Sequence, residues 1–200
     1  MSADASRILE RLAVESLERC VVKLSKVSVG VWHIDKTNIS WGTMEEAIRQ
    51  HSFNNDAASA VYFDIKGGFP FVAMIIFEPR DIECIAKCFL GYAFPRTQSL
   101  RQSEELLLSE LGNIILNSFI GSMCNVLKIS FVPSAPKCVH GEPQYLLEAF
   151  GATMDLKQNF RIITVTLSIQ CDKAVTKSEV IGIIPGKLEA EIERIFKFSF

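Results

Sequence analysis

The spacing of apolar residues predicts alternating helices and strands from the start of the chain. Between Asp4 and Leu24, apolar side chains recur every three or four residues, which indicates an amphipathic helix. We expect a strand over residues 26–32, a short helix over 44–50, strands over 60–65 and 71–77, and a helix over 81–90. Gly67 and Gly68 mark a hairpin turn between the two later strands.

The same pattern then starts again. A loop is expected over residues 92–101, and Ser103 is expected to cap a long helix that reaches Asn125. A strand over 128–132, a short helix over 143–150, a strand pair over 161–170 and 179–184, and a helix over 189–198 complete the series.

The order helix, strand, short helix, hairpin, helix therefore occurs twice. Lys26 and Lys128 begin similar segments 102 residues apart, and Ile76 and Ile184 match at a shift of 108 residues. We interpret this as an internal duplication of about 100 residues. One domain over 1–200, made of pseudo-symmetric halves near 1–95 and 96–200, is expected because neither half alone buries much surface. The predicted fold class is α/β in the α+β sense, with a mainly antiparallel sheet and long helices packed on it.

Composition and charge narrow the functional classes. The 200 residues are 48% hydrophobic and 22% charged, as in an ordinary globular protein, and the net charge is −2. Without a long basic run, binding to nucleic acid or to an anionic membrane has no electrostatic support. The longest apolar run, residues 69–77, is too short to span a bilayer, and the polar N-terminus lacks the apolar core of a signal peptide. We expect a cytoplasmic protein.

The six cysteines form no Cys-x-x-Cys pair. Cys84 and Cys88 could share a helix face, and Cys138 and His140 lie two apart in an expected loop, but these spacings do not fit known zinc frameworks. Most scattered cysteines in a reducing compartment are small core residues. No metal site is predicted from them.

The long central helix contains the most unusual residues. Leu107, Leu108, Leu111, Ile114 and Ile115 make the apolar stripe of a core-facing helix. Glu110 and Asn113 lie one turn apart on one face, and Asn117 continues that line. Gly112 costs about 1 kcal/mol relative to Ala in a helix interior, and Asn also disfavours such positions. Residues that disfavour a helix interior, with no visible gain in stability, indicate a functional site.

The chemistry available to this face is limited. An Asn carboxamide can hold a water molecule, and a Glu carboxylate can pair with a partner's Lys or Arg. Together they could orient water for in-line attack on a phosphoryl group carried by another protein, since positioning is most of what such catalysis requires. A solvated helix face explains Glu110 and Asn117 equally well.

In element order and duplication, the chain resembles the CheC/CheX/FliY family of chemotaxis phosphatases. Residues 109–118 look like the family's helix motif, in which Glu and Asn stand three apart, and Pro136 follows Asn113 after 22 residues, as in that motif. The resemblance implies that Asn113 positions the attacking water at the phospho-aspartate of a CheY-like receiver domain. It implies that Glu110 docks on a receiver Lys and that Pro136 is structural. The phosphatase would bind no metal of its own, because the receiver supplies Mg²⁺.

The chain departs from the family pattern at two places. Leu106 stands where the family usually has Asp or Ser, four residues before the Glu, and the first helix has no Glu-x-x-Asn, so a single centre is expected. A non-catalytic scaffold of the same fold, which binds a CheD-type deamidase or a flagellar switch component, is therefore an alternative. A small-molecule domain has little support, because the sequence has no phosphate-binding glycine loop or nucleophile elbow. The set His33, Asp35 and His51 lacks a neighbouring nucleophile.

Overall fold

A computed structural model gives the structure of the chain and describes residues 3–43, 46, 58–91, 100–142, 145–146 and 159–197. The helices are α1 (Ala3–Val27), α3 (Ile82–Leu90), α4 (Leu100–Leu127) and α6 (Gly186–Lys197), with a 3-10 turn η1 (Pro79–Asp81) before α3. The strands are β1 (Val31–Gly42), β2 (Ala58–Lys66), β3 (Phe71–Phe77), β4 (Val132–Pro133), β5 (Lys137–Gly141), β6 (Phe160–Cys171) and β7 (Ala174–Pro185).

One antiparallel sheet of seven strands organises these elements, which confirms the α+β class and both predicted hairpins. Its order is β1-β6-β7-β3-β2-β4, and β5 also pairs with β2. Each half places the strands before its hairpin on the hairpin of the other half, since β1 pairs with β6 and both β4 and β5 pair with β2. Neither half therefore holds its own sheet.

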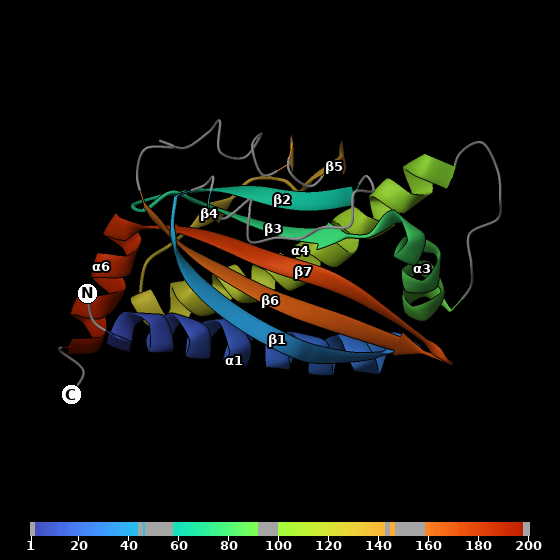
Figure 1. Ribbon diagram of the computed structural model, residues 1–200, viewed down its shortest axis with the longest axis horizontal. Coiled ribbons are helices and arrows are strands. Elements are labelled where there is room, and N and C mark those ends of the chain that lie inside the picture. Colours follow the sequence, from blue (N-terminus) through green and yellow to red (C-terminus); the bar gives the residue numbers. More distant parts are fainter. Residues whose placement is uncertain are drawn as a thin grey trace.

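The pairing at the centre of the sheet is symmetric. In the β3–β7 ladder, Val72 lies opposite Ile183 and Ile75 lies opposite Val180. The shift of 108 residues read from the sequence relates Val72 to Val180 and Ile75 to Ile183. The same shift therefore exchanges these two pairs. Figure 1 shows α1 and α4 on one face of the sheet, with α3 and α6 at opposite ends. Descent by duplication stays a prediction.

The two faces of the sheet bury different cores. On β3, Ala73 and Ile75 point into a large cluster with the helices, whereas Met74 and Ile76 point into a smaller cluster on the opposite face. This alternation follows from the two-residue period of a strand, and it explains why β3 reads as a continuous apolar run. α4 is long and apolar enough between Gln102 and Leu127 to cross a membrane, but 56% of that window is buried, as in a core helix.

Three expected boundaries are wrong. α1 continues to Val27 and β1 starts only at Val31. The N–H of Ser28 still makes the helical bond to the carbonyl of Leu24, so the helical pattern runs through the residues expected to form a strand. Val27 and Val29, which suggested a strand, are exposed residues at the helix end and in the loop, and Val31 begins β1. Likewise, only Val132 and Pro133 form a strand near residues 128–132. Ser103 lies inside α4 and cannot be its cap, since good helix formers extend the helix back to Leu100.

The remaining helix predictions have clear outcomes. The stop at Gly91 is confirmed, because this residue adopts a φ of 81° and donates its N–H to the carbonyl of Lys87. α6 begins three residues before the predicted start at Glu189. The short helices expected over 44–50 and 143–150, and the loop expected over 92–101, lie mostly outside the described residues; residues 46, 145 and 146, which are described, are helical.

Candidate functional site on helix α4

A stripe of four side chains runs along the outer face of α4. It consists of Leu106, Glu110, Asn113 and Asn117, whose three- and four-residue spacing places them above one another. Leu106 is 65% exposed, Glu110 and Asn117 are also exposed, and Asn113 is half-buried. We call these four residues the α4 stripe. The structure thus brings together the two predicted site residues and leaves both accessible to another protein.

The opposite face of α4 fixes the helix on the sheet. Leu108, Leu111 and Ile115 are fully buried in the main core. Gly112 lies directly against β2, where a Cβ atom on the glycine would come within 2.5 Å of Val61 Cγ1. Glycine is needed here for close approach of helix and strand, so its cost in helix propensity has a packing reason. A functional role is therefore not needed to explain why a glycine stands at position 112.

The neighbouring helix α1 supports α4 from the side. The guanidinium of Arg19 donates to the hydroxyl of Ser122 across 3.2 Å, and the thiol of Cys20 lies 3.9 Å from the carbonyl oxygen of Ile114. Burial raises the pKa of the Cys20 thiol, which keeps it neutral in this interface. With the sheet below and α1 beside it, α4 presents the stripe from a rigid element.

Two polar groups of the stripe contact each other. The side-chain amide of Asn117 donates from Nδ2 to Oδ1 of Asn113 across 2.7 Å. Glu110 makes no hydrogen bond or ion pair with the other described residues. Its carboxylate is consequently free for a cation brought by a partner, while the carboxamide of Asn113 is held by its neighbour.

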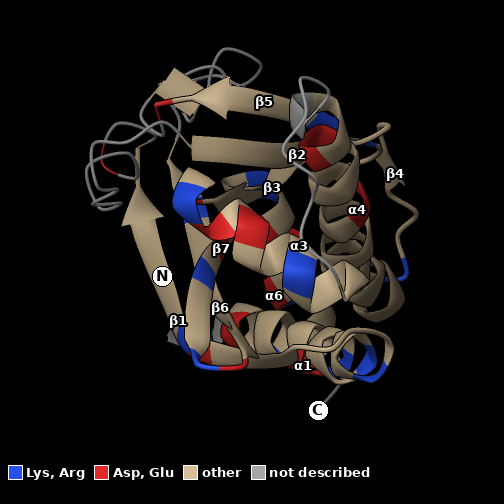
Figure 2. Cartoon of the chain, turned by 90° about the vertical axis from the view of Figure 1, so that its right-hand side faces the viewer, with Lys and Arg blue, Asp and Glu red and all other residues tan. Residues whose placement is uncertain are grey.

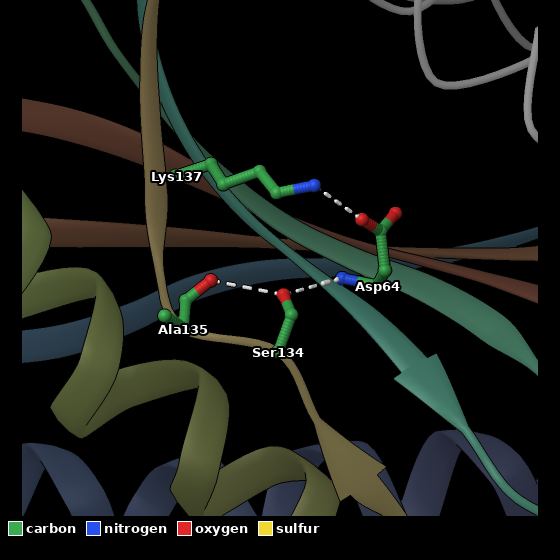
Figure 3. Close-up of polar contacts among 4 residues, drawn as sticks. All are labelled: Asp64, Ser134, Ala135 and Lys137. Atoms are coloured by element: carbon green, nitrogen blue, oxygen red, sulfur yellow. Dashed lines mark hydrogen bonds and ion pairs between the residues drawn. The ribbon is translucent and has the colours of Figure 1, made fainter.

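Pro136 lies between β4 and β5, at the edge of the sheet beside β2. Ser134 donates its backbone N–H to the carbonyl of Asp64 and accepts the Asp64 N–H at its hydroxyl, and Lys137 Nζ lies 2.7 Å from Asp64 Oδ2 (Figure 3). These contacts hold the segment on β2. Proline has no N–H for a ladder, which suits this break between two strands. A structural role of Pro136 in a functional motif stays a prediction.

A second polar group joins α4 to the sheet edge and was not anticipated. His140 on β5 bonds the hydroxyl of Ser59 through Nδ1 at 2.7 Å and the carboxylate of Glu105 through Nε2 at 3.1 Å. The three residues are far apart in sequence, so no spacing could predict them. Ser59 is only 2% exposed, which leaves its hydroxyl no access to a substrate. The arrangement anchors the edge strand β5 to α4.

The other sequence candidates form no reaction centre in the described part of the chain. The Cys84 and Cys88 thiols lie 3.9 Å apart on α3, as their spacing predicts, while Cys138 is on a strand and not in a loop. Asp35 accepts from Ser168, and His51 lies outside the described residues. Within those residues, no three His, Cys, Asp or Glu side chains form a group that could hold a metal. Figure 2 shows acidic and basic residues interspersed over one end of the molecule.

Comparison with known proteins relates the chain to flagellar and chemotaxis proteins by fold. No protein-family model matches it, and no curated protein matches it in sequence. The structure of Thermotoga maritima FliY matches with a TM-score of 0.73 at 14% identity, covering 100% of this chain and 99% of that one. FliM in the FliM–SpeE complex of H. pylori matches with a TM-score of 0.64 at 10% identity, covering 97% of each chain.

A third solved structure is the CheX–CheY–BeF3–Mg²⁺ complex of Borrelia burgdorferi. It matches with a TM-score of 0.57 at 13% identity, covering 88% of this chain and 96% of that one. These matches span nearly the full length of both compared chains, and they agree with the element order described above. The chain therefore has the fold shared by FliY, CheX and FliM, as the resemblance of its sequence predicted.

Proposed function

We propose that this protein hydrolyses the phospho-aspartate of a CheY-like receiver domain, with the α4 stripe as its active surface. The observation that carries the proposal is the placement of the exposed Glu110 and the half-buried Asn113 side by side on the outer face of a helix held rigidly by the sheet. A surface of this kind needs no cavity, because the reacting phosphoryl group is carried on another protein.

The roles of the two residues follow from their chemistry. The carboxamide of Asn113 both accepts and donates hydrogen bonds, so it can hold a water molecule in line with the bond between phosphorus and the aspartate oxygen. Attack by that water breaks this bond and releases inorganic phosphate and the free carboxylate. The carboxylate of Glu110, which pairs with no other residue in the described part of the chain, would pair with a receiver Lys and set the orientation of the two proteins. Mg²⁺ would come with the receiver.

The fold comparisons supply independent support. In Borrelia burgdorferi, CheX, a protein of this fold, was solved as a complex with CheY, BeF3 and Mg²⁺. This precedent makes a receiver domain the first partner to test for this chain. A receiver domain is an intracellular protein, so the proposal includes a cytoplasmic location.

A second candidate function is non-catalytic binding within a chemotaxis or flagellar assembly, including a CheD-type deamidase as partner. FliM domains share the fold, and one was solved in complex with SpeE. Leu106 favours this reading, because a 65% exposed leucine at the start of the stripe suits a protein contact more than a polar reaction centre. Asn113 discriminates the two functions, since a scaffold has no use for a water-positioning amide.

Phosphate loss from phosphorylated receivers of the same organism tests the proposal. Decay would be followed in Mg²⁺ with wild-type protein, with Glu110→Ala and with Asn125→Ala. Asn125 is a matched control, because it is also exposed on α4 but lies twelve residues, or about 18 Å, beyond Asn113. We expect Glu110→Ala to raise the receiver concentration needed for half-maximal rate and Asn125→Ala to change nothing. If wild-type protein does not accelerate phosphate loss at any concentration, the phosphatase function is excluded.

A further inference from the structure

The hydrogen bond between Asn113 and Asn117 determines which side of the Asn113 amide faces outward. Asn117 Nδ2 donates to Asn113 Oδ1 across 2.7 Å. In a carboxamide, oxygen and nitrogen lie on opposite sides of the Cγ atom. Because the oxygen faces Asn117, the NH2 group of Asn113 is turned away from it.

We propose that Asn117 is a positioning residue, which acts through Asn113 and holds its amide in the orientation needed to engage the phosphoryl group and the attacking water. This inference rests on the proposed phosphatase function. It concerns a residue that lies outside the Glu-x-x-Asn pair and to which the resemblance assigns no role.

The bond leaves Asn113 able to do both of its tasks. A carbonyl oxygen has two lone pairs, so Oδ1 can accept from Asn117 and still accept from a water molecule. Both hydrogens of Nδ2 remain available for phosphoryl oxygens. Without Asn117, the amide could rotate about its terminal bond, whose energy profile is broad, and would present either group. Fixing this rotation prepares the site before the receiver docks.

A second asparagine on the same helix shows that the contact is not a general property of exposed amides. Asn125 is exposed on α4, yet it makes no hydrogen bond with the other described residues. Asn117 differs in having an amide four residues before it, on the same face. The pairing therefore comes from the placement of two asparagines along the stripe.

Two substitutions separate the presence of the bond from its direction. Asn117→Ala removes the bond, and we expect the maximal dephosphorylation rate to fall about five- to tenfold, with a half-saturating receiver concentration within about twofold of wild type. Asn117→Asp keeps a hydrogen bond but can only accept, so the Asn113 amide must turn over and point its oxygen outward. We expect a larger loss, of about tenfold or more. Asn125→Asp controls for the added charge on α4.

A double-mutant cycle tests whether Asn117 works through Asn113. In an Asn113→Ala background, replacing Asn117 by Ala should change the rate by less than about twofold, because the group it positions is gone. Asn117→Gln, which retains the donor, should restore at least half of the activity lost in Asn117→Ala. The folded state should be equally stable in all variants at this exposed position.

The outcomes distinguish this inference from the function on which it rests. If wild-type protein accelerates no receiver, both are refuted. If wild-type protein is active and Asn117→Ala retains the full maximal rate, only the positioning role is refuted. A further loss of fivefold or more in the Asn113→Ala background would also overturn it, since Asn117 would then act by itself.

Discussion

Replacing Gly112 by Ala tests the packing that places the α4 stripe. A Cβ atom at this position would lie 2.5 Å from Val61 Cγ1 and 2.7 Å from Val61 Cβ. Ordinary carbon–carbon contacts are about 3.5–4.0 Å, so helix and strand would have to separate by about 1 Å. Overpacking of this kind costs about 1–3 kcal/mol, against a gain of about 1 kcal/mol in helix propensity.

Gly121 provides the matched control on the same helix. A Cβ atom there would meet nothing within 4 Å, so Gly121→Ala should show the propensity gain alone, about 1 kcal/mol of added stability. The propensity terms cancel in the comparison of the two variants. The free energy of unfolding of Gly112→Ala should therefore be about 1–3 kcal/mol below that of Gly121→Ala.

Urea denaturation followed by circular dichroism measures this difference. A Val61→Ala background removes both γ-methyl groups but keeps the Cβ atom, which would lie 2.7 Å away, so in it the penalty for Gly112→Ala should become smaller without disappearing. Equal stabilisation by Gly112→Ala and Gly121→Ala would refute the close approach of α4 to β2. It would also remove the structural reason for a glycine at the centre of this helix.

Three further predictions concern stability, reactivity and docking. Glu189→Ala should lower the free energy of unfolding by about 3–5 kcal/mol in urea denaturation, because it leaves the buried guanidinium of Arg161 unpaired. Replacing Glu191, which pairs with Arg194 at the surface, should cost less than about 1 kcal/mol in the same assay. Burial, together with a hydrogen bond to a neighbouring thiol, raises the pKa of Cys88. Iodoacetamide at pH 8 should therefore leave Cys88 unmodified until the protein is unfolded, as measured by mass spectrometry. Labelling of Cys88 in the native state would contradict its burial. Leu106→Asp should weaken receiver binding several-fold in titrations without changing stability, and unchanged binding would exclude this exposed side chain from the docking surface.

The sequence was sufficient for the elements whose apolar pattern reflects burial. Both hairpins, α1 and α4 were predictable because their periodicity matches the faces they bury. The strand β1 was largely missed, because it lies at the edge of the sheet and its side chains, apart from the buried Trp32, are mostly exposed or half-buried.

The candidate site was only partly predictable. Glu110 and Asn113 are local in sequence, so helical spacing alone placed them on one face. The group formed by Ser59, His140 and Glu105 depends on how β2, β5 and α4 meet, which no local pattern encodes. The role of Gly112 likewise required its neighbour across the core to be known.

The most direct test of the proposed function is the decay of a phosphorylated receiver with wild-type protein and with Asn113→Ala, at saturating concentrations and in Mg²⁺. Asn113 is half-buried on the outer face of α4, so the substitution should leave the fold and the binding of the receiver intact. We predict that the wild-type protein accelerates phosphate loss and that Asn113→Ala reduces the acceleration by about 100-fold, the scale of a lost positioning group. Full activity of Asn113→Ala would contradict the assignment of the α4 stripe as the active surface.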